Sequence, residues 1–441
     1  MKKCISLILA LAMLLTFVAC AAAPSGAEQT TSETKASDAA AGADTENANK
    51  ETRVITWMTT RSSWTAMNLV ADAYMAEHEN VKIEFEIISD RSSYNQKLKV
   101  LAANGELPDL FDSEGDSTLE EIASTGVLAD VDELYTELGY DRMAKIGTEY
   151  ARLSDGKLYS LAWENNVEYF FYHKDMFAAA GIEKTPETFD ELLEVGQKLA
   201  DAGYNGFAVW PGWELLRYLS FVPFRLTGND FITELKAGEA HMSDPVGLQA
   251  AEFFQNCAKY FQPGWATSDY SSALETFMSG NAAMYYIGTW QFGSFVGEDR
   301  ELAGDYGYFK LPTIEGATTT EADMYSNAGT GTSICKDKLD DQLKDFLKYV
   351  LDTFPETAFY ECSALPPMSF DTTRGTFSEF DKAVMADVDS LHSYAYTWDV
   401  KLDASIVEVL NKEIVNLGMN QIGSDEFAAR IDAAIAENLT K

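Results

Sequence analysis

The sequence predicts an α/β fold, because short apolar runs with the two-residue period of a strand alternate with longer segments of helical period. The strand-like runs are 54–58, 81–88 and 109–111, and the second of them alternates Val, Ile, Phe and Ile with other residues. Apolar residues at helical spacing mark 64–78, and a second helix is expected over 94–103, just before an Asn-Gly pair. Strands that alternate with helices favour a largely parallel sheet.

The loops after these strands are the first places to expect ligand-binding side chains. In sheets of this kind ligands bind at the carboxyl ends of the strands. The loops that begin at Thr59 and Asp112 follow the first and the third predicted strands. Both loops are rich in hydroxyl or carboxyl side chains.

Length and charge exclude several classes of function. The chain has 441 residues, about three times the size of a usual single domain, so two or more folded units are expected. Its hydrophobic content of 46% is enough to form real cores, and 70 Asp and Glu against 33 Lys and Arg give a net charge of −37. Such a surface repels phosphate backbones and anionic lipid headgroups, so we expect no nucleic-acid partner.

The start of the chain is typical of an export signal. A positively charged beginning is followed by an apolar run over 5–18, which is too short for a permanent membrane span, and the run ends at Ala19-Cys20. The Ala-Cys pair resembles a bacterial lipobox, which implies removal of residues 1–19 and lipidation of Cys20. An ordinary signal peptide, cleaved near 21–23, is the alternative.

Residues 20–52 are expected to form a disordered, lipid-anchored tether. The stretch consists largely of Ala, Ser, Thr, Glu, Asp, Asn and Gly, and after Cys20 no aliphatic side chain is larger than Ala. Such a segment cannot bury enough apolar surface to offset its chain entropy. A tether behind a lipidated cysteine suits a domain that works close to a membrane.

The cysteines and histidines indicate neither a disulfide framework nor a metal site. Beyond the start of the chain only Cys257, Cys335 and Cys362 remain, at wide spacing. Free thiols are therefore the main expectation, and a Cys335–Cys362 bridge is the alternative. The four histidines lack the spacing of metal ligands, so we expect no metal and no cofactor.

Several segments match, in order along the chain, the motifs of one protein family. The sequence is similar there to the extracellular solute-binding proteins of ABC importers, family 1, which are carbohydrate-binding and maltose-binding-protein-like. Order and spacing carry the resemblance, which covers most of residues 54–370. The matching segments are 105–111 (Gly-Glu-Leu-Pro-Asp-Leu-Phe), 165–177, 180–192, 243–245 (Ser-Asp-Pro), 277–284 (Phe-Met-Ser-Gly-Asn-Ala-Ala-Met) and 288–290 (Gly-Thr-Trp).

The resemblance implies an α/β, two-lobed clamshell of the periplasmic-binding-protein kind, with hinge crossings between the lobes. Residues 160–164, which follow a turn signal, and residues 325–331 suit two of these crossings. Helices are expected over 246–259 and 339–353. The implied first lobe comprises 53–164 plus 327–365, and the implied second lobe comprises 165–326 plus 366–441.

The same resemblance implies a function. The protein would be a substrate-binding lipoprotein that captures a carbohydrate, with an oligosaccharide favoured, and delivers it to the membrane permease of an ABC importer. It would act as a monomer, lipid-anchored at the extracellular face of the bacterial cytoplasmic membrane. Binding of a peptide or another polar solute is the alternative, followed by an extracellular glycan hydrolase. No Gly-x-Ser-x-Gly elbow, phosphate-binding loop or HExxH motif is present, so no enzymatic activity is expected.

Tryptophans beside loop-forming residues are candidates for the sugar-binding surface. The C–H faces of a sugar stack on aromatic rings, whereas its hydroxyl groups need polar partners. Trp64, Trp213 and Trp398 have such positions, and the family motif implies a stacking role for Trp290. Burial in a core is the alternative for each of them.

Polar candidates come from the strand-end loops and the first crossing. Arg61 could donate two hydrogen bonds to a ligand, or form only a surface ion pair. Glu168 and Tyr169 are neighbours in a predicted strand, so only one of them can face the cleft. A solvated acidic turn is the alternative for 112–116, and a flexible hinge for Gly329. The candidates are Arg61, Asp112, Ser113, Glu114, Asp116, Asn166, Glu168 and Gly329.

Overall fold

The computed structural model describes residues 52–440. The expected export signal (1–19), the lipidation of Cys20 and all but the last residue of the expected tether (20–52) lie outside the described residues. Within 52–440, every helix is too short or too polar to cross a bilayer.

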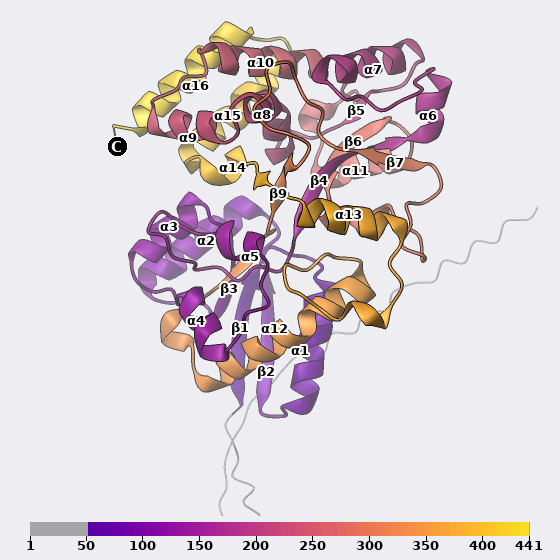
Figure 1. Cartoon of the computed structure of the whole chain (residues 1–441). Helices are drawn as coiled ribbons and strands as arrows, with labels where there is room; N and C mark the ends of the chain where they lie inside the picture. Colours follow the sequence, from indigo (N-terminus) through magenta and orange to yellow (C-terminus); the bar gives the residue numbers. More distant parts are fainter. Residues whose placement is uncertain (1–51, 441) are drawn as a thin grey trace, which may run out of the picture. The chain divides into compact units, whose positions relative to one another are not determined.

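The first sheet has four strands in the order β10-β3-β1-β2 (Figure 1). Strand β1 (Arg53–Thr59) pairs in parallel with β2 (Val81–Ile87) and with β3 (Leu110–Ser113). These are the three predicted strands, and their parallel pairing is confirmed. The fourth strand, β10 (Gly331–Ile334), returns from far along the chain and pairs antiparallel to β3.

Within 52–440, six α-helices fall in the segments that the family resemblance assigns to the first lobe. The helix predicted over 94–103 begins earlier because the carboxylate of Asp90 caps it, accepting from Ser93 N at 2.8 Å. It ends at Gly105, whose φ of +69° suits glycine. The helices are α1 (Thr65–Glu77), α2 (Arg91–Asn104), α3 (Ser117–Ser124), α4 (Val131–Leu138), α5 (Lys145–Glu149) and α12 (Asp341–Cys362).

Helix α12 is longer than predicted. The sequence-based end at residue 353 stops just before Pro355, which usually interrupts a helix. In the structure the helix continues, because Phe354, Ala358 and Phe359 extend the apolar face that is buried beyond that point. Tertiary packing therefore outweighs the local preference of proline.

The second sheet is parallel except for its long strand. Strand β4 (Asn166–His173) lies between β6 (Met284–Gly288) and β7 (Tyr306–Phe309), antiparallel to both, while β5 (Phe207–Ala208) is parallel to β6. The parallel arrangement expected for the first three strands does not extend to this sheet, where β4 is antiparallel to its neighbours. This strand enters from the first lobe, so it runs opposite to the others (Figure 1).

Helices of the second lobe surround this sheet and include the predicted helix at 246–259, observed as α10. They are α6 (Lys174–Ala179), α7 (Phe189–Asp201), α8 (Trp213–Thr227), α9 (Asp230–Ala237), α10 (Pro245–Ala258), α11 (Tyr270–Met278), α13 (Glu379–Asp389), α14 (Trp398–Lys401), α15 (Ala404–Gly418) and α16 (Ser424–Asn438). Short strands β8 (Asp323–Met324) and β11 (Ser393–Tyr394) pair with each other in parallel.

Each lobe has its own aromatic core. In the first lobe Trp57 lies 5.2 Å from Trp64 and 6.3 Å from Trp163, measured between ring centroids. In the second lobe Phe221 and Phe170 both pack on Tyr286, each with a centroid separation of 4.7 Å. Separate cores joined by a few strands are what a clamshell requires.

Two crossing segments run side by side between the lobes. Strand β9 (Ser326–Asn327) pairs with the start of β4, so that Asn166 lies opposite Asn327. Just before them, Leu161 exchanges backbone hydrogen bonds of 2.8 and 2.9 Å with Thr332. The expected crossing regions are thus confirmed, while the residue limits of the two lobes stay a prediction.

The three described cysteines are free thiols, which confirms the main expectation. Cys257 and Cys335 are buried and Cys362 is half-buried. The alternative bridge between Cys335 and Cys362 is therefore wrong.

Candidate functional site

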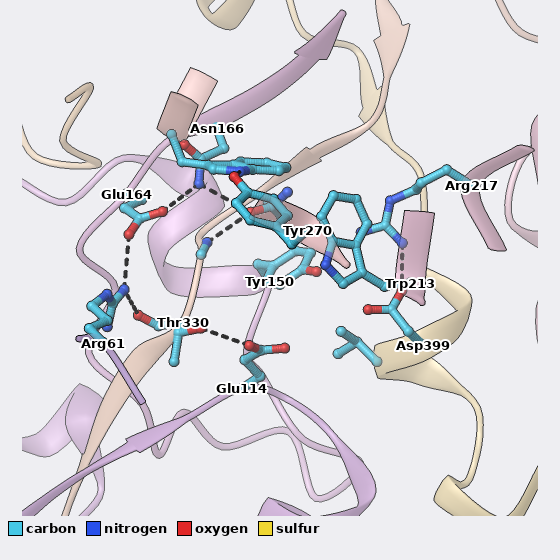
Figure 2. A pocket seen from close by; sticks show the side chains of 14 residues that line it. Arg61, Glu114, Tyr150, Glu164, Asn166, Trp213, Arg217, Tyr270, Thr330 and Asp399 are labelled. Carbon is cyan, nitrogen blue, oxygen red and sulfur yellow. Dashed lines mark hydrogen bonds and ion pairs between the residues drawn. The ribbon is translucent and has the colours of Figure 1, made fainter. Parts of the chain in front are cut away.

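A cavity of about 320 Å³ lies where the crossing segments meet loops of both lobes (Figure 2). Its lining combines aromatic rings with charged and amide side chains. The aromatic groups come mainly from the second lobe, and several of the polar groups come from the first lobe and the crossings. One ligand in this cavity can therefore touch both lobes.

The aromatic wall consists of Trp213 at the start of α8, Tyr270 at the start of α11, and Trp290 just after β6. The rings of Trp213 and Trp290 are 5.7 Å apart at an angle of 71°. The indole N–H of Trp290 donates to the hydroxyl of Tyr270 at 3.3 Å. Burial raises the pKa of Tyr270 to about 12, so this hydroxyl stays protonated at neutral pH.

A glycine in β6 makes room for the key ring of that wall. A Cβ atom at Gly288 would collide with the six-membered ring of Trp290. Because glycine has no side chain, the indole can lie directly against the end of the strand. The Gly-x-Trp spacing of the sequence motif therefore has a packing reason.

A chain of polar groups runs along the crossings, opposite the aromatic wall (Figure 2). Arg61 Nη2 donates to Glu164 Oε1 at 2.9 Å. The other oxygen, Glu164 Oε2, accepts from the amide of Asn166 at 2.7 Å. That amide also donates to Asn327 Oδ1 at 3.3 Å. These contacts orient the polar groups before any ligand arrives.

Gly329 closes this chain from the second crossing. Its φ is +65°, and a Cβ atom there would collide with the carboxyl group of Glu164. Its backbone N–H donates to Asn327 Oδ1 at 2.9 Å. Glycine is therefore required here both by the backbone conformation and by the close approach of Glu164.

A buried ion cluster supports the far side of the cavity. Arg217 Nε lies 3.2 Å from each carboxyl oxygen of Glu168, and Nη1 lies 2.5 Å from Asp399. The guanidinium is 4.9 Å above the ring of Trp213. Burial alone lowers the pKa of Arg217, but the charges of Asp399 and Glu168 outweigh it and the net shift is upward. The guanidinium therefore stays charged and holds Trp213 in place.

A second cavity of about 750 Å³ continues the first. Both share Glu114, Trp213, Tyr270, Thr330 and Asp399 among their lining residues. The additional lining residues include charged and amide groups and one more tryptophan, namely Arg91, Asn95, Asp116, Trp210 and Asn411. The two cavities therefore form one continuous cleft.

The structure brings most of the predicted site residues together. Of the sequence candidates, six line the first cavity and a seventh lines the second. Whether they contact a ligand stays a prediction. The six are Arg61, Glu114, Asn166, Trp213, Trp290 and Gly329, and the seventh is Asp116.

Three polar candidates lie behind the lining instead. Asp112 is buried and accepts from the hydroxyl of Thr59 at 2.8 Å. Ser113, the last residue of β3, donates from its Oγ to Ser160 Oγ at 2.8 Å. Glu168 is buried beneath Arg217. Their placement corrects the expectation of direct exposure to the cleft, because buried polar groups are used to position their neighbours.

Two tryptophan candidates belong to the cores. Trp64 is 9% exposed and lies beneath Arg61, whose guanidinium carbon is 4.1 Å from its ring centroid. Trp398 is 2% exposed and stacks on Phe231. Neither lines the two cavities, so the core alternative is correct for both.

Sequence reasoning did not single out several cavity residues. Arg217 had a visible signal, since it is one of two arginines within the otherwise largely apolar run of α8. For two others the sequence predicted a neighbouring position: Trp398 in place of Asp399, and Asn166 near Glu164. Residues that line the cavity without having been predicted are Tyr150, Glu164, Arg217, Tyr270, Asn327, Thr330, Asp399 and Val400.

A model of the family described as bacterial extracellular solute-binding protein matches residues 60–353. The match covers more than half of the chain and includes both crossings and most of the cavity. The chain belongs to this family. Members of the bacterial extracellular solute-binding proteins bind solutes outside the cytoplasm, as binding proteins and not as enzymes.

Two relatives illustrate the range of this family. The chain is 26% identical over 246 residues to a maltotriose-binding protein of Pyrococcus abyssi, covering 56% of this chain and 50% of the relative. It is 25% identical over 296 residues to a diacetylchitobiose binding protein of Streptomyces coelicolor, covering 65% of this chain and 66% of the relative. The chain thus spans between half and two thirds of these relatives' length.

The fold is shared with solved structures of the family. A structure titled chitin oligosaccharide binding protein superposes with a TM-score of 0.77 at 20% identity, covering 88% of this chain and 98% of the other. This likeness confirms the two-lobed α/β architecture of the solute-binding proteins.

Proposed function

We propose that this solute-binding protein captures a carbohydrate in the cleft between its lobes, with an oligosaccharide favoured. The observation that carries the proposal is the aromatic wall of Trp213, Tyr270 and Trp290 facing the polar chain from Arg61 to Asn327. Flat rings suit the C–H faces of a sugar, and paired donors and acceptors suit its hydroxyl groups. The two relatives and the solved structure are all named as saccharide-binding proteins, which supports the same ligand class.

Capture works by closure of the two lobes. The ligand touches Arg61 and Glu114 of the first lobe and Trp213 and Trp290 of the second. Only a closed arrangement satisfies both sets of contacts, so the ligand shifts the population toward it by its difference in affinity for the two states. A membrane permease can then distinguish the loaded from the empty protein.

The proposal also covers the cellular location of the protein and its partners. Lipidation of Cys20 anchors the protein, through the segment 20–52, to the extracellular face of the bacterial cytoplasmic membrane. The protein acts there as a monomer and delivers its ligand to the permease of an ABC importer. In bacterial cells, Cys20→Ser releases the protein into the medium and abolishes incorporation of labelled fatty acid. Retention of label in this variant would contradict the anchor.

The decisive experiment is isothermal titration calorimetry of the full chain with maltotriose, N,N′-diacetylchitobiose, a chitin oligosaccharide and a tripeptide. We expect saccharide binding, and Trp290→Ala weakens it by about 2 kcal/mol or more, as for a buried aromatic anchor. Tyr360→Ala is the matched control, because Tyr360 contacts Asp371 and Phe370 away from the cavity. Binding of the tripeptide alone would replace carbohydrate by the alternative ligand class. Consumption of a saccharide during the titration would replace binding by hydrolysis.

A further inference from the structure

The charge of the cleft is the feature that carries a further inference, which rests on the proposed function. Among the described residues that line the two connected cavities, the basic side chains are those of Arg61, Arg91 and Arg217. An anionic group on a ligand would need one of these cations to be available. The surroundings of each arginine decide whether one is.

Arg61 is held between two carboxylates. Its Nη2 lies 2.9 Å from Glu164 Oε1, and its Nη1 lies 3.7 Å from Asp112 Oδ1. Nη2 also donates to the backbone oxygen of Thr330 at 2.5 Å. Among the described residues Nη1 makes no hydrogen bond, but it is buried, so the nitrogen that faces a ligand is Nη2, which is already paired.

Arg91 repeats the arrangement in the second cavity. Its Nη1 lies 3.1 Å from Glu114 Oε1 and its Nη2 lies 3.7 Å from Asp116 Oδ2. The charges of these two carboxylates raise the pKa of the guanidinium. Asp116 also caps α3, accepting from Leu119 N at 2.9 Å, so the start of that helix is closed to a second anion.

Arg217 is the third case, held by Glu168 at 3.2 Å and by Asp399 at 2.5 Å. Six acidic side chains therefore pair with three arginines, and the formal charge of the group is three units negative. Figure 2 shows Glu114, Glu164 and Asp399 facing the cavity around its centre. A ligand anion would meet this excess of negative charge, and it would compete with the paired carboxylates for each guanidinium.

We propose that the cleft selects saccharides without acidic groups: it rejects uronates and sugar phosphates, and it accepts an amino sugar with a protonated amine at least as well as the neutral one. The residues that set this selectivity are the paired acids, above all Asp116 and Asp399. Bringing a like charge against such a site is unfavourable, so we expect at least about a tenfold loss of affinity for an acidic saccharide. Salt reduces that loss because it screens the repulsion.

The test compares ligands that differ in charge. Calorimetry at pH 7 and low salt is carried out on the full chain with maltotriose and with maltotriose oxidised to a carboxylate at one C6. The trimers of N-acetylglucosamine and of glucosamine form the second pair. If maltotriose binds, we expect its carboxylate form to bind at least about tenfold more weakly. If the trimer of N-acetylglucosamine binds, we expect the trimer of glucosamine to bind no more weakly. Equal binding of an acidic and a neutral form, or rejection of the amine form, would overturn the inference while leaving carbohydrate binding intact.

A pair of variants tests the residues without relying on a saccharide. Thermal unfolding of the full chain is followed with and without sn-glycerol 3-phosphate, an acidic polyol. The double variant Asp116→Asn/Asp399→Asn removes one of the two paired carboxylates from each of Arg91 and Arg217, so this probe should raise its melting temperature but not that of the parent. The control Asp72→Asn/Asp201→Asn makes the same change of net charge at exposed sites on α1 and α7. Stabilisation of the parent, or an equal response of both double variants, would contradict the role of the paired acids. If the double variant responds to sn-glycerol 3-phosphate as expected but the protein binds no saccharide, the proposed function fails while the charge selection holds.

Discussion

Glu214 has a carboxyl group whose surroundings disfavour its ionised form. It is fully buried in the first turn of α8, and among the described residues neither carboxyl oxygen accepts a well-formed hydrogen bond. The hydroxyl groups of Tyr218 and Tyr285, which also have no partner, are electrostatically coupled to it. Burial, reinforced by the negative charge of Glu168, raises the pKa of Glu214 well above its usual value. Glu214 therefore retains its proton in the folded state at a pH where the unfolded chain has lost it.

This retention predicts a pH dependence of stability. Because the folded state binds the extra proton, the free energy of unfolding falls as the pH rises above 4.5, the ordinary value for a glutamate, by up to about 1.4 kcal/mol per pH unit. Glu214→Gln removes this loss. We expect its stability relative to the parent to increase between pH 5 and pH 8, measured by urea unfolding at about pH 5 and 8. The exposed Glu408→Gln serves as control, and a parallel pH dependence of parent and Glu214→Gln would contradict the assignment.

Gly329 offers a second test at the scale of one residue. Gly329→Ala places a side chain at a φ of +65° and against Glu164. We expect a loss of about 1–3 kcal/mol in unfolding free energy and weaker saccharide binding, since the polar chain must shift. Gly304→Ala is the matched control, because a Cβ there meets nothing within 4 Å and its φ is not positive. Equal stability of the two variants would show that the backbone at 329 tolerates a side chain.

Both ways of choosing single positions had mixed results: the motif segment 165–177 also holds Glu168, which does not line the cavity, and the choice by residue type also found Trp213, which does. Trp290 and Asn166 line the cavity, and both lie in matched motifs. Trp64 and Trp398 were chosen because they flank loop residues, a property that core tryptophans share. Ion pairs such as Arg217 with Asp399 join positions 182 residues apart, and one sequence contains no signal for that pairing.

At the scale of elements, the short pairing of β8 with β11 depends on one carboxylate. Asp323 accepts hydrogen bonds from the hydroxyl of Ser393 at 2.6 Å and from the backbone N–H of Thr320 at 2.7 Å. Burial alone would raise its pKa, but these bonds outweigh burial and lower the pKa to about 2. The carboxylate thus ties the segment before α14 to the segment that leads into the second crossing.

The shift of Asp323 predicts acid sensitivity. A lowered pKa in the folded state means that the stabilisation is complete above 3.8, the ordinary value, and is lost as the pH falls toward 2. Asp323→Asn should therefore be less stable than the parent at pH 6, with the difference shrinking between about pH 4 and pH 2. Unfolding free energies at these pH values, obtained from urea titrations, measure it. A difference that is constant with pH would rule out the ionised carboxylate as the cause.

Local sequence patterns predicted which elements form, but not how they are directed. Strands β1, β2 and β3 and helices α1, α2 and α10 lie close to their expected positions, since period and capping are local properties. The reversed direction of β4 and the length of α12 were missed. Both depend on partners distant in sequence, namely the crossing from the first lobe and the apolar face buried around Phe354.

At the scale of the whole molecule, a half-buried lysine connects the lobes. Lys401, at the end of α14, donates to the backbone oxygens of Tyr150 at 3.0 Å and Gly115 at 3.4 Å. Tyr150 also shares a hydrogen bond of 3.1 Å with Thr397. Burial, followed by the nearby charge of Lys236, lowers the pKa of Lys401. These contacts hold the two lobes at their present separation.

Removing this tie should open the molecule. Lys401→Met keeps the apolar stem but loses both hydrogen bonds, each worth about 1 kcal/mol. We expect a larger radius of gyration of the ligand-free protein by small-angle X-ray scattering, and roughly tenfold weaker saccharide binding, because closure then starts from a more open state. Lys198→Met, exposed on α7, is the control. An unchanged radius together with unchanged affinity would mean that the lysine only fills space.

The pairing of β4 with β9 has a consequence for how this molecule can evolve. Asn166 and Asn327, which lie opposite each other in the two crossings, belong both to the hinge and to the cavity lining. A substitution there that adapts the protein to a new nutrient also alters the stiffness of the hinge. Recognition and motion are therefore inherited together along these strands, whereas the aromatic wall can diversify more freely. Adaptation to a new ligand should therefore change Trp213, Tyr270 or Trp290 before it changes the two asparagines.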